Sequence, residues 1–302
     1  MGGKLLSGFG WRRSVFLVTL VGCMLLLFWI LPGSWNWWAT RGADFTVHFF
    51  DVGQGDSAFV QCRRTQAVID GGPSRAVLQK VGRAMPFTDR RIEYVFLTHP
   101  HDDHFFGLFD LLERYEIGHL VITEYTAEQE VGRELIALAE RHNIKVLLAE
   151  AGDTMQLGGC GEFEVLWPDQ RSQPVAENGR DYDNDLSLML ELRSAVGAPL
   201  ALFTGDIGVE VEYALLDDDA LHRTPIMKVP HHGSRYSSSS DFVQAVRPEF
   251  AIFPVGENRF GHPSETTLLR YEKLQTKIRR SDFDGDTVFA VSPSDIVELI
   301  SD

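Results

Sequence analysis

Short apolar runs separated by polar turns are the clearest pattern in the chain after residue 44. Three such runs between residues 45 and 69 are divided by turn residues, which predicts a β-meander. Helical periodicity and strand-like runs then alternate along the chain. The expected elements of this part lie near residues 75–84, 93–98, 105–115, 118–122, 127–142 and 144–148.

The second half of the chain repeats this alternation around a polar segment at residues 169–185. We expect helices near residues 208–216, 239–246 and 264–274, and strands near residues 162–167, 186–192, 200–203, 226–229, 249–254, 287–291 and 296–300. No Pro- or Ser-rich linker separates the two halves. The pattern therefore predicts one α+β domain over residues 44–302, with two similar sheet halves.

The start of the chain has a different pattern. Residues 15–31 contain no charge, basic residues precede them and tryptophans follow. This predicts a transmembrane anchor at residues 14–32, with a basic segment at 1–13 and a linker at 33–43. The positive-inside rule then predicts a single-pass protein of a bacterial-type inner (plasma) membrane, with an extracytoplasmic domain. A cleaved signal peptide and a lipoprotein processed at Cys23 are the alternatives.

Composition narrows the picture further. Of 302 residues, 44% are hydrophobic and 24% charged, as in ordinary globular proteins. The net charge of −15 argues against a protein that binds nucleic acid over its whole surface. Any binding of a polyanion would therefore need a local basic patch. With Cys23 in the apolar run, Cys62 and Cys160 are the remaining pair for a disulfide, and the sequence does not favour their pairing.

A dense group of polar side chains follows the apolar run at residues 94–97. His99, His101, Asp103 and His104 lie within six positions, and imidazole with carboxylate suits zinc, manganese or iron. Packing these imidazoles together without a metal would cost solvation and, once protonated, repulsion. A His-rich surface loop is the alternative for any single residue. The whole group predicts a two-metal centre, with His99 and His101 at one ion.

Further polar residues occur where other predicted strands end. Because strand ends in a sheet-based enzyme converge on the active site, we expect them to meet the histidine group. Each string also has an ordinary explanation, such as a turn or a helix cap. The strings are Asp70-Gly71-Gly72, Thr204-Gly205-Asp206, His231-His232-Gly233-Ser234 and Gly261-His262-Pro263.

Taken together, these strings resemble the signature of the metallo-β-lactamase superfamily. The resemblance is closer to the extracytoplasmic hydrolase domain of ComEC-type DNA-uptake competence proteins, and it covers residues 44–290. It implies a four-layer αβ/βα sandwich with two divalent ions, Zn²⁺ or Mn²⁺, at one edge. Besides the strings already quoted, it rests on Phe50-Asp51-Val52-Gly53-Gln54-Gly55-Asp56-Ser57, Asn184-Asp185-x-Ser187-Leu188 and Lys228-Val229-Pro230.

The resemblance also implies roles for individual residues. His99 and His101 would bind the first ion, and Asp103 and His104 the second. Asp206 would bridge the two ions. For the remaining ligand of the second ion, we choose His231 over His232 because it comes first after the strand.

One departure concerns the first ion. The superfamily usually supplies a third histidine shortly before the bridging aspartate, yet no histidine lies between His142 and Asp206. Residues 183–185 are expected to take this place, which makes the first site richer in oxygen and manganese as suitable as zinc.

The implied activity is metal-dependent hydrolysis through a hydroxide held between the ions. Asp103 and Asp206 would anchor that hydroxide, and His262 would contact the substrate or the leaving group. Further substrate contacts are expected from Asp70, Asn184, His232 and Ser234.

The expected protein is a membrane-anchored phosphodiesterase or nuclease that acts on DNA or another phosphodiester. Hydrolysis of a lactone, thioester or β-lactam on the same fold is the first alternative, because fold does not fix the substrate. A non-catalytic binding module with a vestigial site is the second. The sequence identifies no protein partner.

Overall fold

The computed structural model describes residues 16–22, 43–86, 88–169, 182–292 and 294–299. The chain divides into two compact units, Met1–Arg41 and Gly42–Asp302. In the first unit, residues 16–22 form a short helix. Within the described parts of the chain, no helix combines the length and the apolar composition needed to cross a membrane. The remaining residues of the expected anchor at 14–32 lie outside the described ranges.

Two mixed β-sheets form the centre of the unit Gly42–Asp302. The first has eight strands in the order β15-β14-β1-β2-β3-β4-β5-β6, and the second has seven in the order β13-β12-β11-β10-β9-β8-β7. The strands of the first sheet are β1 (Phe45–Phe49), β2 (Ala58–Cys62), β3 (Thr65–Ile69), β4 (Arg91–Phe96), β5 (Glu116–Ile122), β6 (Lys145–Leu148), β14 (Thr287–Ser292) and β15 (Asp295–Leu299). Those of the second are β7 (Thr154–Leu157), β8 (Gly161–Trp167), β9 (Met189–Ser194), β10 (Pro199–Phe203), β11 (Ile226–Lys228), β12 (Phe250–Phe253) and β13 (Lys277–Arg280).

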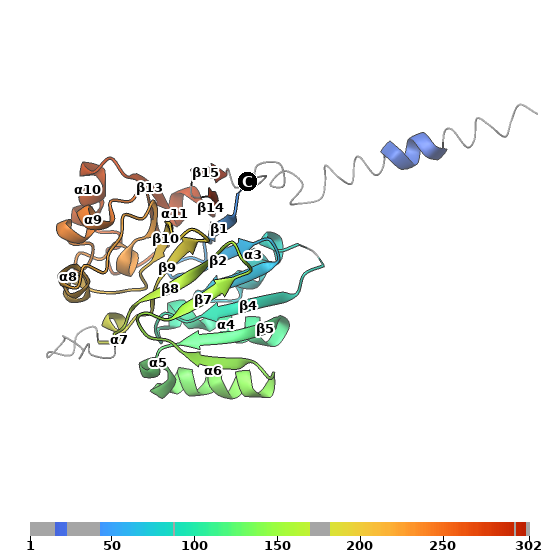
Figure 1. Ribbon diagram of the computed structural model, residues 1–302, viewed down its shortest axis with the longest axis horizontal. Helices are drawn as coiled ribbons and strands as arrows, with labels where there is room; N and C mark the ends of the chain where they lie inside the picture. The colour runs from blue at the N-terminus through green and yellow to red at the C-terminus, as the bar shows by residue number, and fades with distance from the viewer. Residues whose placement is uncertain (1–15, 23–42, 87, 170–181, 293, 300–302) are drawn as a thin grey trace, which may run out of the picture. The chain divides into compact units, whose positions relative to one another are not determined.

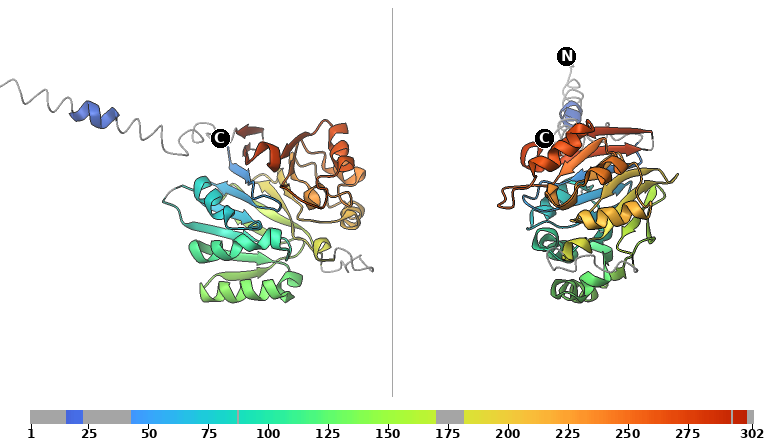
Figure 2. Two further views of the ribbon diagram at one scale, coloured as in Figure 1. Left: turned by 180° about the vertical axis from the view of Figure 1, so that it is seen from behind. Right: turned by 90° about the vertical axis from the view of Figure 1, so that its left-hand side faces the viewer.

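Helices cover the outer face of each sheet, so the unit has four layers. Helices α3, α4 and α6 share an apolar core with the first sheet, and α8, α9 and α10 share another with the second. Figure 1 labels these helices, and Figure 2 shows from behind that the teal and green group lies apart from the orange group. The described helices are α3 (Ala76–Ala84), α4 (Asp102–Arg114), α5 (Glu124–Glu128), α6 (Glu130–Arg141), α7 (Tyr182–Asp185), α8 (Val209–Asp217), the 3₁₀ helix η1 (Pro230–Gly233), α9 (Ser240–Val246), α10 (Glu265–Lys273) and α11 (Ser281–Asp284).

The apolar runs of the inner strands follow from burial on both faces. Alternate side chains of a strand point to opposite faces of its sheet. On β2, Val60 therefore packs between the two sheets, whereas Phe59 packs against the helices. On β3, Ala67 and Ile69 pack between the sheets and Val68 packs against the helices. The predicted α+β domain with two sheets is confirmed.

The structure also contains a feature that the sequence did not favour. A disulfide joins Cys62, at the end of β2, to Cys160, in the turn before β8, and therefore links the two sheets. Both residues are buried, and their Cα atoms lie 6.2 Å apart, within the range that a disulfide spans. The sequence could not indicate this pairing because 98 positions separate the cysteines and only the packing of the sheets brings them together.

Candidate metal centre

Strand ends from both sheets supply the side chains of the candidate metal centre. In the first sheet, β4 leads into the loop with His99 and His101, and Asp103 and His104 lie in the first turn of α4. In the second sheet, Asp206 follows β10, and η1 follows β11. Strands β3, β4 and β5 are parallel, as are β10, β11 and β12, so their carboxyl ends meet at one edge of each sheet.

The Asp206 carboxylate lies at the point where these side chains converge. Its Oδ2 atom is 3.2 Å from His232 Nε2, 3.5 Å from His104 Nε2 and 4.0 Å from His99 Nε2. Asp103 also lies near two of these imidazoles, with Oδ2 3.3 Å from His232 Nε2 and Oδ1 4.0 Å from His104 Nε2. The three imidazoles and Asp206 are buried, whereas the Asp103 side chain is 33% exposed. The cluster therefore opens to solvent on the Asp103 side.

Hydrogen bonds on the far side of the rings fix which nitrogen faces the carboxylates. His104 Nδ1 lies 2.8 Å from Asp70 Oδ2, and His232 Nδ1 lies 2.8 Å from the carbonyl oxygen of Pro254. Both Nε2 atoms are buried and find no hydrogen-bond partner among the described residues. Buried polar atoms are rarely left unpaired, and an acceptor behind Nδ1 is the usual support of a metal-binding histidine. The residues therefore fit a metal ion bound through Nε2.

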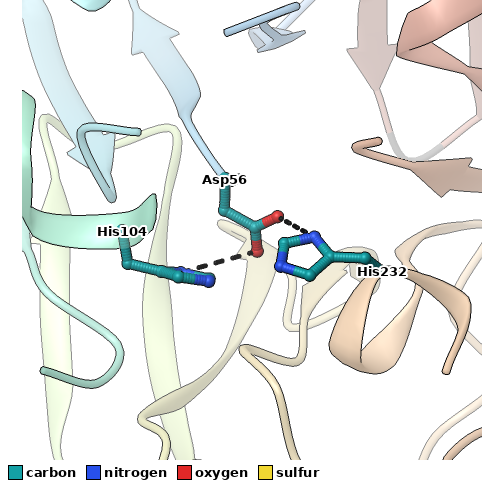
Figure 3. Close-up of side chains that lie close together, drawn as sticks. All are labelled: Asp56, His104 and His232. Carbon is teal, nitrogen blue, oxygen red and sulfur yellow. Dashed lines mark ion pairs between the residues drawn. The ribbon is translucent and has the colours of Figure 1, made fainter. Parts of the chain in front are cut away.

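A second grouping of ligand-type atoms lies behind the first. Figure 3 shows the Asp56 carboxylate between His104 and His232, 3.9 Å and 3.2 Å from their Nδ1 atoms. Since Asp70 and Pro254 already occupy those Nδ1 atoms, Asp56 supports the rings from behind. The Nε2 side, with Asp103 and Asp206, is the better place for an ion.

A buried lysine holds the carboxylates in position. Lys228 Nζ lies 2.5 Å from Asp56 Oδ2 and 2.9 Å from Asp206 Oδ1, and it donates to the carbonyl oxygen of Gly205. Burial alone would raise the pKa of Asp206, but His232 and Lys228 hold it well below its usual value. Burial would lower the pKa of Lys228, but Asp206 and Asp56 raise it. Both groups therefore stay charged, and Lys228 engages Oδ1 while Oδ2 faces the imidazoles.

The histidines around Asp206 differ in charge. Burial, followed by the charge of His104, holds the pKa of His99 well below its usual value, so this ring is neutral. Against burial, Asp206 and neighbouring carboxylates raise the pKa values of His104 and His232. Burial would raise the pKa of Asp103, but the close contact with His232 and the charge of His104 lower it to about 2. Metal binding at these rings therefore competes with protons.

The other predicted site begins at His99 and extends toward α7. His99 Nε2 lies 3.1 Å from His101 Nδ1, and His101 Nε2 lies 3.4 Å from Asp183 Oδ2. The Tyr125 hydroxyl donates a hydrogen bond to Asp183 Oδ1. Asp183 thus lies where the sequence analysis expected a carboxylate in place of a third histidine. Its neighbour Asn184 is buried away from solvent.

The fold and this constellation agree with the comparison to known families. The family model of the metallo-beta-lactamase superfamily matches residues 50–172. This part of the chain is similar to metallo-beta-lactamase superfamily domains. The matched range includes β2 to β8 and the group from His99 to His104, whereas Asp206 and His232 follow it in the second sheet.

Two curated relatives of this chain are competence proteins. The chain is 26% identical over 258 residues to ComE operon protein 3 of Bacillus subtilis, covering 79% of this chain and 32% of that protein. It is 26% identical over 251 residues to competence protein ComA of Neisseria gonorrhoeae, covering 82% of this chain and 32% of that protein. The chain therefore spans about a third of the length of these relatives.

A solved structure shows the same fold. The metallo-beta-lactamase fold protein YhfI from Bacillus subtilis superposes with a TM-score of 0.56 at 10% sequence identity. The match covers 81% of this chain and 100% of that protein. At this identity the likeness concerns the fold alone.

The structure differs from the sequence-based choice between the two adjacent histidines. His232, not His231, places its Nε2 atom between Asp103 and Asp206. The His231 ring instead lies 5.3 Å from the ring of His262, between centroids. Positive φ angles at both residues, 48° and 52°, turn the two side chains in different directions. His232 was expected at the substrate, and it lies in the cluster instead.

Two residues expected to contact substrate, Asp70 and Ser234, are buried. Asp70 accepts hydrogen bonds from Thr98 N and Thr98 Oγ1, each at 2.8 Å, and supports His104. Ser234 is buried, and its backbone oxygen accepts from the Thr267 hydroxyl. Asp70 thus lies behind His104, and the contact of either residue with substrate stays a prediction. His262 is half-buried, and burial, followed by the charge of His231, lowers its pKa to about 4.

Sequence reasoning did not assign the supporting roles of Asp56 and Lys228. Both residues belong to strings that the sequence analysis gave only as part of the family resemblance. Their pairing depends on the approach of the two sheets, which no local pattern encodes. The signal that was available is a lysine at the end of an apolar strand run, directly before Val229 and Pro230.

Proposed function

We propose that this domain is a dinuclear metal-dependent hydrolase that cleaves phosphodiesters, with DNA as the favoured substrate. The observation that carries the proposal is the convergence of the buried Nε2 atoms of His104 and His232 on Asp103 and Asp206. A site without function would not need to keep these two Nε2 atoms aligned or their Nδ1 atoms hydrogen-bonded to Asp70 and Pro254. The hydrolase fold and the similarity to competence proteins support the same proposal.

The proposed ligand sets follow the two halves of the constellation. Asp103, His104 and His232 would hold one ion, and His99, His101 and Asp183 the other. Asp206 lies next to three of the imidazoles and would bridge the two ions. Divalent ions in such a site lower the pKa of water and neutralise the charge that develops on phosphoryl oxygens.

The protein's own residues have distinct proposed tasks. Lys228 fixes Asp206 Oδ1, so that Oδ2 keeps its orientation among the imidazoles. Asp103 lies on the side open to solvent and would accept a hydrogen bond from the attacking water. His262 is half-buried beside His231 and His232, and its Nδ1 atom has no hydrogen-bond partner among the described residues. We assign it the contact with the leaving-group oxygen.

A local basic patch supports a phosphodiester substrate despite the net charge of −15. Arg235 and Arg259 are exposed on the two segments that carry His232 and His262. Arg235 is one of the charges that act on His262, after burial and the neighbouring histidines, to lower its pKa. Two guanidinium groups beside the cluster suit the phosphates that flank a scissile bond.

We further propose that residues 14–32 anchor the chain in a membrane and that the hydrolase domain is extracytoplasmic. The uncharged run at residues 15–31 supports the anchor, and the basic residues before it support the orientation. The disulfide between Cys62 and Cys160 supports an oxidising compartment, because such bonds are rare in the cytosol.

The variant Asp103→Asn tests the hydrolase proposal. Purified full-length chain loaded with Mn²⁺ or Zn²⁺ should cleave single- or double-stranded DNA. Because Asn keeps the shape of Asp103 but removes the charge that faces His104 and His232, kcat should fall at least about 100-fold, comparable to loss of one strong electrostatic contact at a transition state. The measurement is initial rate against substrate concentration, with metal content determined on the same sample.

The matched control is Asp102→Asn, which removes the neighbouring carboxylate on the exposed side of α4. It should keep full activity. Equal activity of Asp103→Asn and wild type would contradict the proposal. A metal-loaded wild type that hydrolyses a lactone, a thioester or a β-lactam but no phosphodiester would replace the proposed substrate class.

A further inference from the structure

The loop from Gly256 to Pro263, which follows β12, carries an exposed aromatic ring next to the metal centre. The Phe260 side chain is 70% exposed, and Arg259 beside it is also exposed. The same loop contains His262, whose ring lies against His231 and His232. Phe260 is therefore close to the cluster along the chain, but it contributes nothing to the buried core.

Three rings lead outward from the metal centre to Phe260. The centroids of His232 and His262 are 6.4 Å apart, with an angle of 29° between the ring planes. Those of His262 and Phe260 are 5.7 Å apart, with an angle of 30°. A planar group placed next to Phe260 would thus be separated from the His232 ring by the rings of Phe260 and His262.

One side chain fixes the backbone on which Phe260 stands. Asn258 Oδ1 accepts hydrogen bonds from the amides of Phe260, Gly261 and His262 at 3.1–3.2 Å. Asn258 Nδ2 donates to the carbonyl oxygens of Gly256 and His262 at 2.9 and 2.8 Å. The loop is therefore pre-organised although its aromatic ring is exposed. An exposed aromatic ring held on a fixed loop beside the candidate metal centre is well placed to contact a ligand.

A second aromatic and a second arginine lie on the segment that follows η1. Tyr236 is 67% exposed, and the Arg235 guanidinium lies 5.9 Å from the centroid of its ring. The loop between Gly256 and Pro263 contains one acidic residue, Glu257, and one arginine, Arg259. The surroundings of His262 thus combine exposed aromatic rings with guanidinium groups, which is the combination that binds single-stranded nucleic acid.

We propose that Phe260 is a stacking platform for the nucleobase adjacent to the scissile phosphodiester of a single-stranded nucleic acid. Asn258 is the positioning residue of this platform, and Arg235 and Arg259 contact the backbone phosphates. In a duplex the bases are paired and stacked on each other, so this contact favours single-stranded segments. The inference deepens the proposed phosphodiesterase function and rests on it for the identity of the reacting bond.

The test is binding of a fluorescein-labelled twelve-residue oligothymidylate to the full-length chain in the presence of a chelator, so that no cleavage occurs. Fluorescence anisotropy should show about tenfold weaker binding by Phe260→Ala, within the range for loss of one stacked base. Phe260→Trp should bind at least as tightly as wild type. An oligonucleotide of the same length without bases should bind wild type and Phe260→Ala equally.

Two further variants separate the platform from a general apolar surface. Phe283 lies on α11, its side chain is 76% exposed, and the Arg280 guanidinium packs over its ring. Phe283→Ala should leave oligothymidylate binding unchanged. Asn258→Ala should weaken binding although Phe260 is present. Wild-type binding no tighter than that of Phe260→Ala, or an equal loss on the base-free oligonucleotide, overturns the inference, as does the absence of any binding by wild type.

Cleavage with Mn²⁺ distinguishes failure of this inference from failure of the proposed function. With both correct, Phe260→Ala raises KM for oligothymidylate about tenfold and leaves kcat nearly unchanged. Cleavage with an unchanged KM rejects the stacking platform and keeps the phosphodiesterase. Binding that depends on Phe260, without any cleavage by metal-loaded wild type, keeps the platform and rejects the phosphodiesterase.

Discussion

At the residue scale, backbone conformation decides which of two adjacent histidines reaches the candidate metal centre. The sequence shows only that both follow a strand, and it predicts that a histidine from this pair lies near Asp206. The φ angles of His231 and His232 are both positive, and L-residues adopt this region rarely. The choice between them depends on that turn, which no pattern of residue types reveals.

Loss of the correct histidine should reduce metal affinity selectively. His232→Gln keeps much of the side-chain volume but removes the Nε2 atom between Asp103 and Asp206. We expect Zn²⁺ affinity to fall at least about 100-fold, since even loss of an outer partner of a ligand costs about 10- to 100-fold. Competition with a chromophoric chelator measures this change. His231→Gln is the matched control and should stay within about twofold of wild type, and the reverse ranking would restore His231 as the ligand.

The residues that could bind metal were predictable from the sequence, but the residues that hold them in position were not. His99, His104 and Asp206 were expected at one site because strand ends converge. In the structure, one ligand-type atom of each lies within 4.8 Å of the other two. Asp56 and Lys228 pair across the two sheets, from before β2 to the end of β11. Such a pair requires knowledge of the packing between distant elements, which the sequence does not contain.

At the scale of elements, the placement of α4 controls the orientation of His104. The amide of Gly71 donates to the carbonyl oxygen of His104 at 2.6 Å, and the amide of Gly107 donates to that of Gly72 at 3.2 Å. A Cβ atom on Gly107 would lie 2.2 Å from the carbonyl oxygen of Gly71. Helix α4 therefore packs directly on the turn after β3, and this turn also carries Asp70.

Replacement of two helical glycines by alanine should change stability in opposite directions, because only Gly107 lies against another backbone segment. Gly107→Ala should lower the free energy of unfolding by about 1–3 kcal/mol, because α4 must move away from the turn after β3. Gly82→Ala on α3 is the control, since its Cβ would meet only Tyr115 Oη at 3.5 Å. It should raise stability by about 0.5–1 kcal/mol, the ordinary gain from replacing glycine in a helix. Denaturant unfolding measures both, and equal effects would contradict the packing argument.

Elements with strong periodicity were predicted better than short polar ones. The meander β1 to β3 and the alternation from α3 to β6 follow the predicted order. The region expected as one helix at 127–142 is divided at Gln129 into α5 and α6. Strands β7 and β13 were missed because each has only four residues and includes polar positions that face solvent. Their assignment depends on pairing with β8 and β12.

At the scale of the whole molecule, two cross-links of different kinds join the sheets. The disulfide connects β2 to the turn before β8, and the ion pair of Lys228 with Asp56 connects β11 to the segment before β2. The two-sheet arrangement itself was predictable from the two runs of strands. The partition of strands was not, since β14 and β15 return to pair beside β1 in the first sheet.

Removal of the disulfide should destabilise the folded domain. The double variant Cys62→Ala/Cys160→Ala should lose about 2–5 kcal/mol of unfolding free energy, because the unfolded chain is no longer constrained. Denaturant unfolding of oxidised and reduced protein measures the loss. Reduced wild type should match the double variant, and a reductant should leave the double variant unchanged. Equal stability of oxidised and reduced wild type would contradict this expectation.

The position of the candidate metal centre at the junction of the sheets has a consequence for a divided chain. A cut between β6 and β7 would leave His99, Asp103 and His104 on one fragment and Asp206 and His232 on the other. The second fragment would also carry β14, which pairs with β1 of the first. Neither fragment holds a full ligand set, so high-affinity metal uptake by a mixture of the two would report their reassembly. Metal binding would thus measure whether the two fragments associate into the folded domain.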